Sequence, residues 1–503
     1  MGKLTDLAPE AVFRFFEEIC GIPHGSYHVD AISDHLAAFA KTRGLEVIQD
    51  QEKNIIVKLP ASEGYEKEPV LILQGHMDMV AVNDDPAVDM ETTPLDVTHD
   101  DEWVYAKGSS LGGDDGIAVA MMMALMDDTT IPHPALELVI TTNEEVGMEG
   151  AVGLDASVLQ GKRMLNLDSE DEGIFTVGCA GGVRVVVRKD PEDVTVEKWR
   201  ELDEQGWLES IEYDSDSVEA VMIRIELNGL QGGHSGQMIH LGRANAIRVM
   251  ARLMADAQKQ FPVGLNMLDG GTADNAIPHG AVLCLEIRKQ DQSAFCEWIQ
   301  QEEKILQEEY KGIDDGLKLN IQVVDTTGFT GDHICRAQYL SKLLLEEPDG
   351  VQAMSKAIPG LVETSLNCGI ARCNASEYEL HFELRSMVGK ESVALRDKVV
   401  SIGEKYDAKA EVSASYPEWE YREQSPLRDK MTRIFREMYH KEPVIEAIHA
   451  GLECGVLAKK IEDFDAVSIG PDMQDIHTTK ERLSIESVRR TWAFVLEILK
   501  EKD

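Results

Sequence analysis

The sequence is poor in basic residues and in long apolar runs. Lysine and arginine number 49 against 91 aspartates and glutamates, so the formal net charge is −42. A surface of this sign repels phosphate backbones and anionic lipids, which argues against nucleic-acid and membrane partners. The longest uninterrupted apolar run, Ile117 to Met126, is far shorter than the roughly 18 to 20 residues that span a bilayer.

Cysteine gives no sign of a disulfide framework or a thiolate metal site. The eight cysteines form no C-x-x-C pattern, and the closest pair is Cys368 and Cys373, so we interpret them as buried or idle thiols. The N-terminus has no basic region followed by an apolar stretch, as a signal peptide would, and we therefore expect a cytoplasmic protein. With 43% hydrophobic residues in 503, the chain can bury more than one core.

Helical and strand patterns alternate through the first part of the chain. An apolar helix is predicted at about 116–126. Strands are predicted at 55–58, 70–74, 136–142 and 164–167. This order predicts an α/β domain with a mixed, mainly parallel sheet and helices on both faces.

A second region interrupts this pattern. The segment 189–217 is acidic and without clear periodicity, and we place a domain boundary near it. Strands follow at 221–227, 282–288 and 377–385, with helices at 243–260, 337–345 and 391–405. The last hundred residues return to the first pattern, with a helix from about Pro426, a strand at 464–468 and a helix capped by Ser484. We predict a discontinuous catalytic domain, residues 1–188 and 391–503, and an inserted α+β domain, residues 189–390.

Acidic and imidazole side chains follow several of the predicted strands. They are His76 and Asp78, Asp114 and Asp115 before the apolar helix, Glu144 and Glu145, Asp168, and His477 in a late loop. In an open α/β sheet the ligand site lies outside the carboxyl ends of the strands, so we expect these side chains to converge.

Such a cluster of carboxylates and imidazoles would repel itself strongly unless cations compensated it. Histidine and carboxylate without thiolate suit Zn²⁺, Mn²⁺ or Co²⁺ better than Ca²⁺. Two ions about 3.5 to 4 Å apart, sharing a carboxylate and a water, would account for the number of ligands. Each pattern alone has a plainer interpretation, such as a loop pair or a solvated acidic face. Their joint position at strand ends favours a two-metal hydrolase.

Nine short motifs also resemble a known family. They are GHMDMV, LGGDDGIA, TTNEEVGMEGA, LNLDSE, GGHSG at 232–236, GGTADNAIP at 270–278, GLVETSLN at 360–367, HAGLECG at 449–455 and IHTTKERL. Together they resemble the co-catalytic zinc aminoacylase and carboxypeptidase group of metallopeptidases, and within it the bacterial aminoacyl-histidine (Xaa-His) dipeptidases. The dipeptidase branch usually has Ala-Asp-Asn where this chain has Gly113, Asp114 and Asp115, which keeps the ligand.

The resemblance implies a role for each of these side chains. Two divalent ions, Zn²⁺ or alternatively Mn²⁺ or Co²⁺, would be bridged by Asp114 and by a water that acts as the nucleophile. His76 and Asp168 would complete one site, and Glu145 and His477 the other. Asp78 would orient His76, and Glu144 would be the general base. The family also suggests a cis peptide bond after Asp114.

The inserted domain resembles the family's lid and dimerisation domain, which implies a homodimer. His234 would donate to the oxyanion of the tetrahedral intermediate, while Asn275 and Arg385 would hold the substrate backbone and its C-terminal carboxylate. Plainer interpretations are a Gly-rich turn with a surface histidine, and a surface ion pair for Arg385. Glu453 would either contact the substrate's free amino group or support the metal ligands.

We therefore expect a dinuclear metallodipeptidase that hydrolyses unblocked dipeptides, including Xaa-His dipeptides such as carnosine. The alternative is a related amidohydrolase on the same metal core: a tripeptidase, a carboxypeptidase or an N-acyl amino acid deacylase. A third possibility is a metal-poor binding protein that kept the fold. Its expected mark is the loss of a ligand or of the base, and none of these residues is lost.

Overall fold

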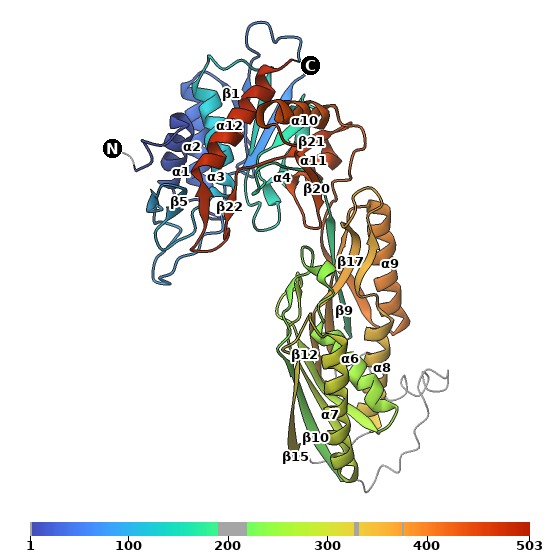
Figure 1. The fold of residues 1–503 in the computed structure, drawn as a ribbon. Coiled ribbons are helices and arrows are strands. Elements are labelled where there is room, and N and C mark those ends of the chain that lie inside the picture. Colours follow the sequence, from blue (N-terminus) through green and yellow to red (C-terminus); the bar gives the residue numbers. More distant parts are fainter. Residues whose placement is uncertain (1–2, 190–218, 326–330, 375–376, 503) are drawn as a thin grey trace. The chain divides into compact units, whose positions relative to one another are not determined.

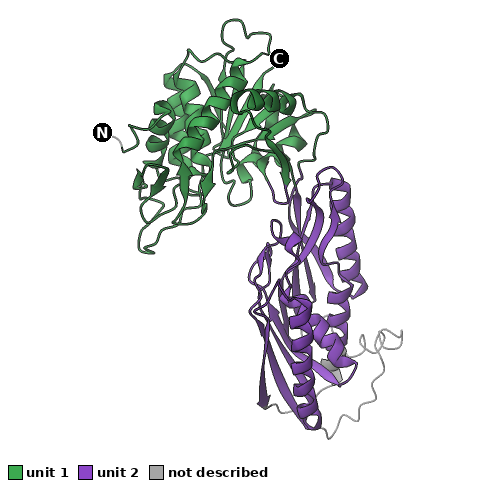
Figure 2. Cartoon of the chain, viewed as in Figure 1, with its two compact units in different colours: residues 1–179, 419–447, 452–503 green, residues 180–418, 448–451 purple. Residues whose placement is uncertain are grey.

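The computed structural model describes residues 3–189, 219–325, 331–374 and 377–502 (Figure 1). The chain divides into two compact units (Figure 2). Unit 1 comprises residues 1–179, 419–447 and 452–503, and unit 2 comprises residues 180–418 and 448–451. The acidic segment predicted to mark a boundary lies, from residue 190 on, outside the described residues. The lid role of the inserted domain, 189–390, stays a prediction.

Unit 1 is built on a mixed sheet. Within the described residues it has eight strands in the order β1-β2-β6-β3-β7-β21-β8-β20. The four central strands run parallel, with β3 between β6 and β7 and with β21 beside β7. Strand β2 is antiparallel to β1 and to β6, and β8 is antiparallel to β21. The strands are β1 Glu46–Gln49, β2 Ile55–Leu59, β3 Leu71–His76, β6 Leu136–Thr141, β7 Arg163–Asn166, β8 Ile174–Cys179, β20 Val444–Ile448 and β21 Asp465–Ser468. The mixed, mainly parallel sheet is confirmed.

A smaller antiparallel sheet accompanies it, made of β4 Val97–His99, β5 Trp103–Ala106, β22 Met473–Gln474 and β23 Arg482–Ser484. The helices of unit 1 are α1 Glu10–Cys20, α2 Asp30–Thr42, α3 Gly113–Asp127, α4 Glu149–Gly153, α10 Pro426–Tyr439, α11 Glu453–Lys460 and α12 Ile485–Lys500. Two predicted starts are confirmed: Ser484 caps α12 by accepting from the Ser487 amide, and α10 begins at Pro426.

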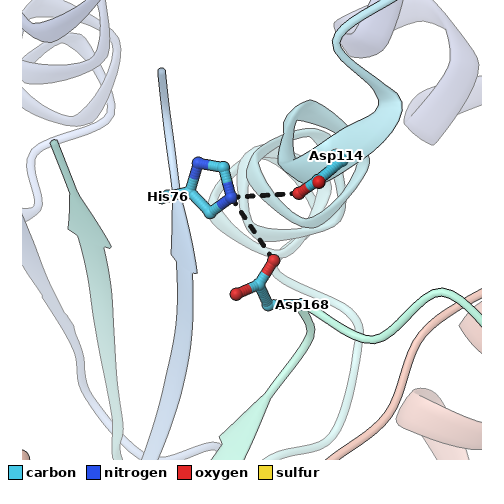
Figure 3. A group of neighbouring side chains, drawn as sticks. All are labelled: His76, Asp114 and Asp168. Carbon is cyan, nitrogen blue, oxygen red and sulfur yellow. Dashed lines mark hydrogen bonds and ion pairs between the residues drawn. The ribbon is translucent and has the colours of Figure 1, made fainter. Parts of the chain in front are cut away.

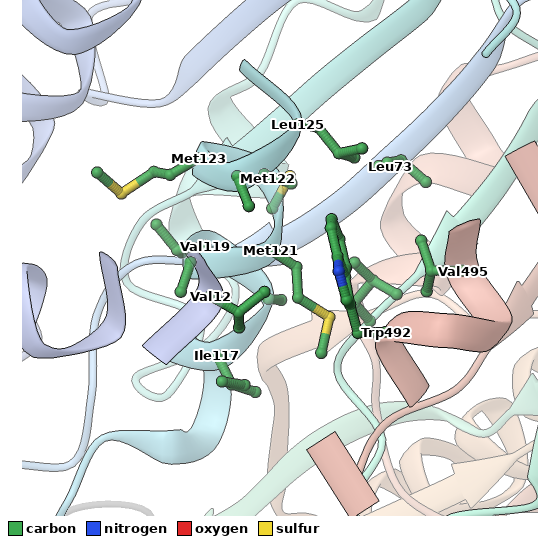
Figure 4. Packing of buried hydrophobic residues seen from close by; sticks show 14 of the residues in the cluster. Val12, Leu73, Ile117, Val119, Met121, Met122, Met123, Leu125, Trp492 and Val495 are labelled. Atoms are coloured by element: carbon green, nitrogen blue, oxygen red, sulfur yellow. The ribbon is translucent and has the colours of Figure 1, made fainter. Parts of the chain in front are cut away.

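Helix α3 contains the apolar run of the sequence and lies in the core. Every residue from Ile117 to Met126 is buried. Val12 of α1, Leu73 of β3 and Trp492 of α12 pack around it (Figure 4). A helix that is apolar on all sides needs such an enclosed position. Complete burial of one valine, leucine, isoleucine or methionine side chain stabilises a fold by about 1.5 to 3 kcal/mol. None of the described helices combines the length and the apolar character needed to cross a membrane.

Unit 2 is built on an antiparallel sheet, as an α+β domain should be. Among the described residues the order is β15-β10-β14-β12-β17-β18-β9-β19, with β16 pairing with β17. The strands are β9 Gly181–Lys189, β10 Ala220–Asn228, β12 Val263–Gly270, β14 Ala281–Arg288, β15 Lys318–Asp325, β16 Gly350–Met354, β17 Val362–Asn374, β18 Tyr378–Ser386 and β19 Lys409–Tyr416. The helices are α6 Ala246–Gln258, α7 Gln292–Glu309, α8 Gly331–Glu346 and α9 Gly389–Lys405. Side chains along β10 alternate between buried and half-buried, because only one face of such a strand packs on the core.

Candidate active site

The predicted side chains of unit 1 converge at one edge of its sheet. His76 is the last residue of β3, Asp168 follows β7 by two residues, and Asp114 lies in the first turn of α3. Glu144 and Glu145 belong to the loop after β6, and His477 to the loop between β22 and β23. The parallel strands β3, β6 and β7 bring their carboxyl ends together, which explains why residues distant in sequence meet here.

Asp114 belongs to two groups of side chains that could each hold a metal ion. In the first group, Nε2 of His76 lies 3.0 Å from Oδ1 of Asp114 and 3.3 Å from Oδ1 of Asp168 (Figure 3). In the second, Nε2 of His477 lies 3.1 Å from Oδ2 of Asp114 and 2.9 Å from Oε1 of Glu145. The two oxygens of one carboxylate thus face two different histidines.

Asp78 holds the orientation of His76. Nδ1 of His76 donates to the backbone oxygen of Asp78 over 2.9 Å, which leaves Nε2 to face the other acids. The Asp78 carboxylate accepts from Oγ of Ser26 at 2.8 Å and from the Glu144 amide at 3.0 Å. Asp78 therefore ties the end of β3 to the loop that carries Glu144. The carboxylate of Glu144 lies with His76 and Glu145 in a group whose ligand atoms are within 4.8 Å of one another.

The electrostatics of this cluster fit a site for cations. Burial raises the pKa of Asp168 to about 6, and burial together with Asp168 and Glu453 raises the pKa of Glu144 well above its ordinary value. Hydrogen bonds to Asp114 and Glu145 raise the pKa of His477 to about 10. Burial disfavours the charged form of the two acids, and the carboxylates that contact His477 favour its protonated form. Two imidazoles among carboxylates suit divalent ions such as Zn²⁺, Mn²⁺ or Co²⁺.

Asp115 supports the backbone of His76. The peptide bond between Asp114 and Asp115 is cis, as the family resemblance implied. Oδ2 of Asp115 accepts from the His76 amide at 3.2 Å, and the carboxyl group is fully buried. This approach requires a glycine at position 75, because a Cβ there would lie 2.3 Å from the same oxygen. The sequence drew attention to Asp115 only as the neighbour of Asp114.

Glu481 is a residue whose role the sequence did not reveal. Its buried carboxylate accepts from three successive backbone amides at the start of α3: Leu111 at 2.8 Å, Gly112 at 3.2 Å and Gly113 at 2.8 Å. Negative charge is favourable at a helix N-terminus, where the amides have no partner within the helix. Glu481 lies in the motif IHTTKERL, four residues after His477. It therefore joins the loop that carries His477 to the turn that carries Asp114, two candidate ligands.

Glu453 lies beneath the ligands and is fully buried. Its Oε2 accepts from Nε2 of Gln74 at 2.5 Å and from Oγ1 of Thr141 at 2.6 Å. Gln74 also accepts from Asn166 at 2.6 Å, so the network joins β3, β6 and β7. Of the two roles weighed from the sequence, this position favours support of the metal ligands over contact with a substrate.

The predicted residues of the inserted domain lie in unit 2, where His234 and Asn275 are neighbours. His234, on β11 Gly233–His234, pairs with Ala276 of β13 Ala276–Ile277, and Asn275 precedes that pair. Nδ1 of His234 accepts from the amides of Gly236 and Gln237, at 3.2 and 3.1 Å, so its proton is on Nε2. Burial and the neighbouring Arg385 lower the pKa of His234 to about 4, which keeps the ring neutral.

Arg385 and a second histidine complete this group. Arg385 on β18 pairs with Ser365 of β17, whose Oγ lies 2.7 Å from Nε2 of His449. A side chain at Gly236 would meet the His449 backbone oxygen at 2.2 Å and Nε of Arg385 at 3.1 Å, so these parts are close together. Nε of Arg385 is buried without a hydrogen-bond partner among the described residues. The sequence contained His449 only as part of the motif HAGLECG.

Unit 1 thus combines a mainly parallel α/β sheet with a candidate metal centre at the carboxyl ends of its strands. The model of the peptidase family M20/M25/M40 matches residues 72–501. The chain therefore belongs to this family, which confirms the resemblance drawn from the motifs.

Individual relatives agree with this assignment. The chain is 33% identical over 504 residues to the cytosol non-specific dipeptidase of Escherichia coli (strain K12), an alignment that covers 100% of this chain and 99% of that protein. The crystal structure of aminoacylhistidine dipeptidase from Vibrio alginolyticus has a TM-score of 0.87 at 30% identity and covers 99% of this chain and 98% of the other. A tripeptidase from Staphylococcus aureus, with a TM-score of 0.53 at 17% identity over 98% of both chains, shares the fold.

Proposed function

We propose that this chain is a dinuclear metal-dependent dipeptidase that hydrolyses unblocked dipeptides, including Xaa-His dipeptides such as carnosine. The observation that carries the proposal is the position of Asp114, whose two oxygens face His76 and His477 at 3.0 and 3.1 Å. His76, Asp114 and Asp168 would hold one ion, and Asp114, Glu145 and His477 the other. We propose Zn²⁺ as the ion, and Mn²⁺ or Co²⁺ would suit the same donors.

The ions, when bound, would supply Lewis-acid activation of water and of the peptide carbonyl. Glu144 would take the proton of the attacking water and deliver it to the nitrogen of the leaving amine. Its carboxylate lies within 4.8 Å of the ligand atoms of His76 and Glu145, close to where the ions would be held, so it could serve both halves of this transfer. Asp78 would keep Nε2 of His76 directed at the ions through the bond at Nδ1.

The group in unit 2 would serve the substrate. A neutral His234 with its proton on Nε2 is a hydrogen-bond donor, which suits an oxyanion. Arg385 would bind the C-terminal carboxylate through its buried Nε–H, which lacks a partner among the described residues, whereas its two terminal nitrogens already contact Glu383 and Tyr416. Asn275, exposed beside the His234 pair, would hold the substrate backbone.

The names of the similar proteins support dipeptides as the substrate. One is a non-specific dipeptidase and one an aminoacylhistidine dipeptidase. A cytoplasmic location is proposed because the curated relative is a cytosol enzyme. A homodimer formed through the inserted domain, residues 189–390, is likewise proposed, and sedimentation of the purified protein tests it.

The test is turnover and metal content measured on one sample. Metal-free protein reloaded with Zn²⁺, Mn²⁺ or Co²⁺ is offered carnosine, Gly-His, a tripeptide and an N-acetyl amino acid. We expect two ions per chain by elemental analysis and hydrolysis of the dipeptides. Preference for the tripeptide or the acylated amino acid would support the alternative amidohydrolase.

Asp114→Ala tests the shared ligand. We expect it to hold less than one ion per chain after dialysis, while Asp101→Ala, a change at an exposed acid, holds two. Retention of two ions by Asp114→Ala would reject the shared-ligand assignment.

A further inference from the structure

Unit 1 contains a cavity of about 610 Å³ beside the candidate metal centre. Three segments line it: residues 25–28, residues 79–91 in part, and residues 145–146. Glu145, a candidate metal ligand, is part of its wall. Ser26, on another wall, donates to Asp78 at 2.8 Å. The cavity therefore opens directly beside the atoms where the reaction would occur.

The walls of this cavity are apolar and its rim is acidic. The apolar residues are Met79, Val80, Ala81, Pro86, Val88, Met90 and Val146. Asp85, Asp89 and Glu91 are exposed at the rim, and none of them is a candidate metal ligand. No lysine or arginine is among the described residues that line the cavity. Its one imidazole, His28, lies 3.1 Å from Oε1 of Glu91.

The rim is held in place by its own side chains. The amide of Ala87 donates to Asp85 and the amide of Glu91 donates to Asp89, each over 3.0 Å. Oγ1 of Thr479, in the loop of His477, donates to Asp84 at 2.5 Å. The negative charges therefore stand at defined positions before any ligand arrives, which lowers the entropic cost of binding.

We propose that this cavity receives the N-terminal residue of the dipeptide, a step that rests on the proposed function. An unblocked dipeptide carries its ammonium group on the first residue and its carboxylate on the second. The acidic rim attracts the ammonium group and repels the carboxylate. The apolar walls take the side chain of that first residue, with a cationic end favoured and an anionic end disfavoured.

The size and composition of the cavity also predict weak selection by shape. Its volume is within the range of about 300 to 1,000 Å³ that is usual for small-molecule sites and exceeds what one side chain fills. Met79 and Met90 are flexible and polarizable, so they adapt to different occupants. We therefore expect the cavity to discriminate among dipeptides by the charge of the N-terminal side chain more than by its size.

Two series of dipeptides test this inference on the metal-loaded enzyme. In the Xaa-Gly series we expect kcat/KM for Leu-Gly and Lys-Gly to exceed that for Glu-Gly by about tenfold or more. In the Gly-Xaa series we expect no such penalty for Gly-Glu.

Glu91→Lys is the decisive variant, because the Glu91 side chain is exposed at the rim, where it contacts His28 at 3.1 Å. We expect Glu-Gly turnover to rise and Lys-Gly turnover to fall by about fivefold each, with Gly-Xaa substrates unchanged. Glu63→Lys, the same charge change at an exposed acid outside the cavity, is the matched control. A response of the Gly-Xaa series instead would place the C-terminal residue here and overturn the inference.

Val88→Trp provides a second, steric test. It narrows the cavity, so kcat/KM for Leu-Gly should fall at least tenfold while Gly-Gly and Gly-Leu are retained. If neither variant altered either series, the cavity would not be a substrate site. If the metal-loaded wild type hydrolysed no dipeptide of either series, the proposed function would fail, and this inference with it.

Discussion

Each unit of the chain buries a cluster of ionisable groups, and the two clusters have opposite character. In unit 1 carboxylates predominate, and burial raises the pKa of Asp168 to about 6. In unit 2 an arginine lies with two histidines, and burial and Arg385 lower the pKa of His234 to about 4 and that of His449 to about 3.

The difference shows what each cluster requires. Like charges that are buried together are costly unless a group of opposite charge joins them. The carboxylates of unit 1 require cations, which the metallopeptidase family assignment explains. In unit 2 both histidines are neutral and Arg385 lies 3.5 Å from the buried Glu383, so of the Arg385 nitrogens only Nε–H lacks a partner among the described residues. An anion such as the carboxylate of the proposed peptide substrate would supply that partner. The predictions below test this division of roles.

The largest effect is expected from Glu144→Gln. The amide cannot accept the proton of water, so kcat should fall by about a thousandfold. The metal content should stay at two ions per chain, because Glu144 is the proposed base and not a ligand. Stopped-flow or endpoint assays of Gly-His hydrolysis with elemental analysis measure both. Glu149→Gln, a change at an exposed acid of the same loop region, is the control, and wild-type kcat in Glu144→Gln would remove the base from the mechanism.

The next effect tests whether unit 2 recognises an anion. Arg385→Met should lower kcat/KM for dipeptides by about a hundredfold, because a buried charge pair with the substrate carboxylate is lost. The same loss should occur when the wild type is offered dipeptide amides, which lack that carboxylate. For Arg385→Met, kcat/KM should then be the same for dipeptides and for dipeptide amides. Arg396→Met, at a half-buried arginine of α9 that pairs with Asp397, is the control. A further loss on amidation in Arg385→Met would mean that Arg385 binds something else.

A smaller effect, on metal affinity, is expected from Glu481→Gln, which tests whether Glu481 holds the turn that carries Asp114. The amide oxygen can accept from fewer of the three amides at residues 111–113, so the turn that presents Asp114 loosens. Metal affinity, measured by competition with a chromogenic chelator, should fall about 10- to 100-fold. Glu462→Gln, an exposed change, should leave it unaltered. Unchanged affinity in Glu481→Gln would limit this residue to a structural role.

The smallest effect concerns Glu453 and pH. Burial raises its pKa from 4.5 to about 7, so between these values the folded protein holds a proton that the unfolded chain releases. Stability from this group is present below about pH 4.5 and is lost as the pH rises toward 7. In metal-free protein, a change from pH 6 to pH 7 should cost the wild type about 1 kcal/mol more than Glu453→Gln, measured by urea unfolding. If the free energy of unfolding changed equally with pH in the wild type and in Glu453→Gln, Glu453 would already be ionised in the folded protein at pH 6.

Much of the fold could be predicted because helices, strands and helix starts depend on residue patterns over short stretches of the chain. The alternation of apolar strands with amphipathic helices was enough to predict the parallel centre of unit 1, and the apolar run at Ile117 predicted α3. Ser484 and Pro426 marked helix starts because capping is a property of a few neighbouring residues. The acids at the strand ends were predicted to converge because parallel strands share one edge.

Other parts of the site depend on pairs that no local pattern reveals. Glu481 bonds to amides some 370 residues away, and Glu453 reaches Gln74 across 379 residues. His449 and Ser365 are 84 residues apart in the sequence, yet their side chains lie 2.7 Å apart. Such contacts are made by the folded chain, and a glutamate in a polar motif looks the same in sequence whether it is solvated or buried.

The sequence by itself predicted an α/β fold, the residue types of the candidate metal ligands and the membership of a family, since these depend on residue types in order along the chain. Only the tertiary structure decided which oxygen of Asp114 faces which histidine, which acids lie beneath the ligands, and that a cavity with an acidic rim opens beside Glu145. The physical reason is that pKa, hydrogen bonding and cavity shape depend on distance and burial, which exist only once the chain has folded.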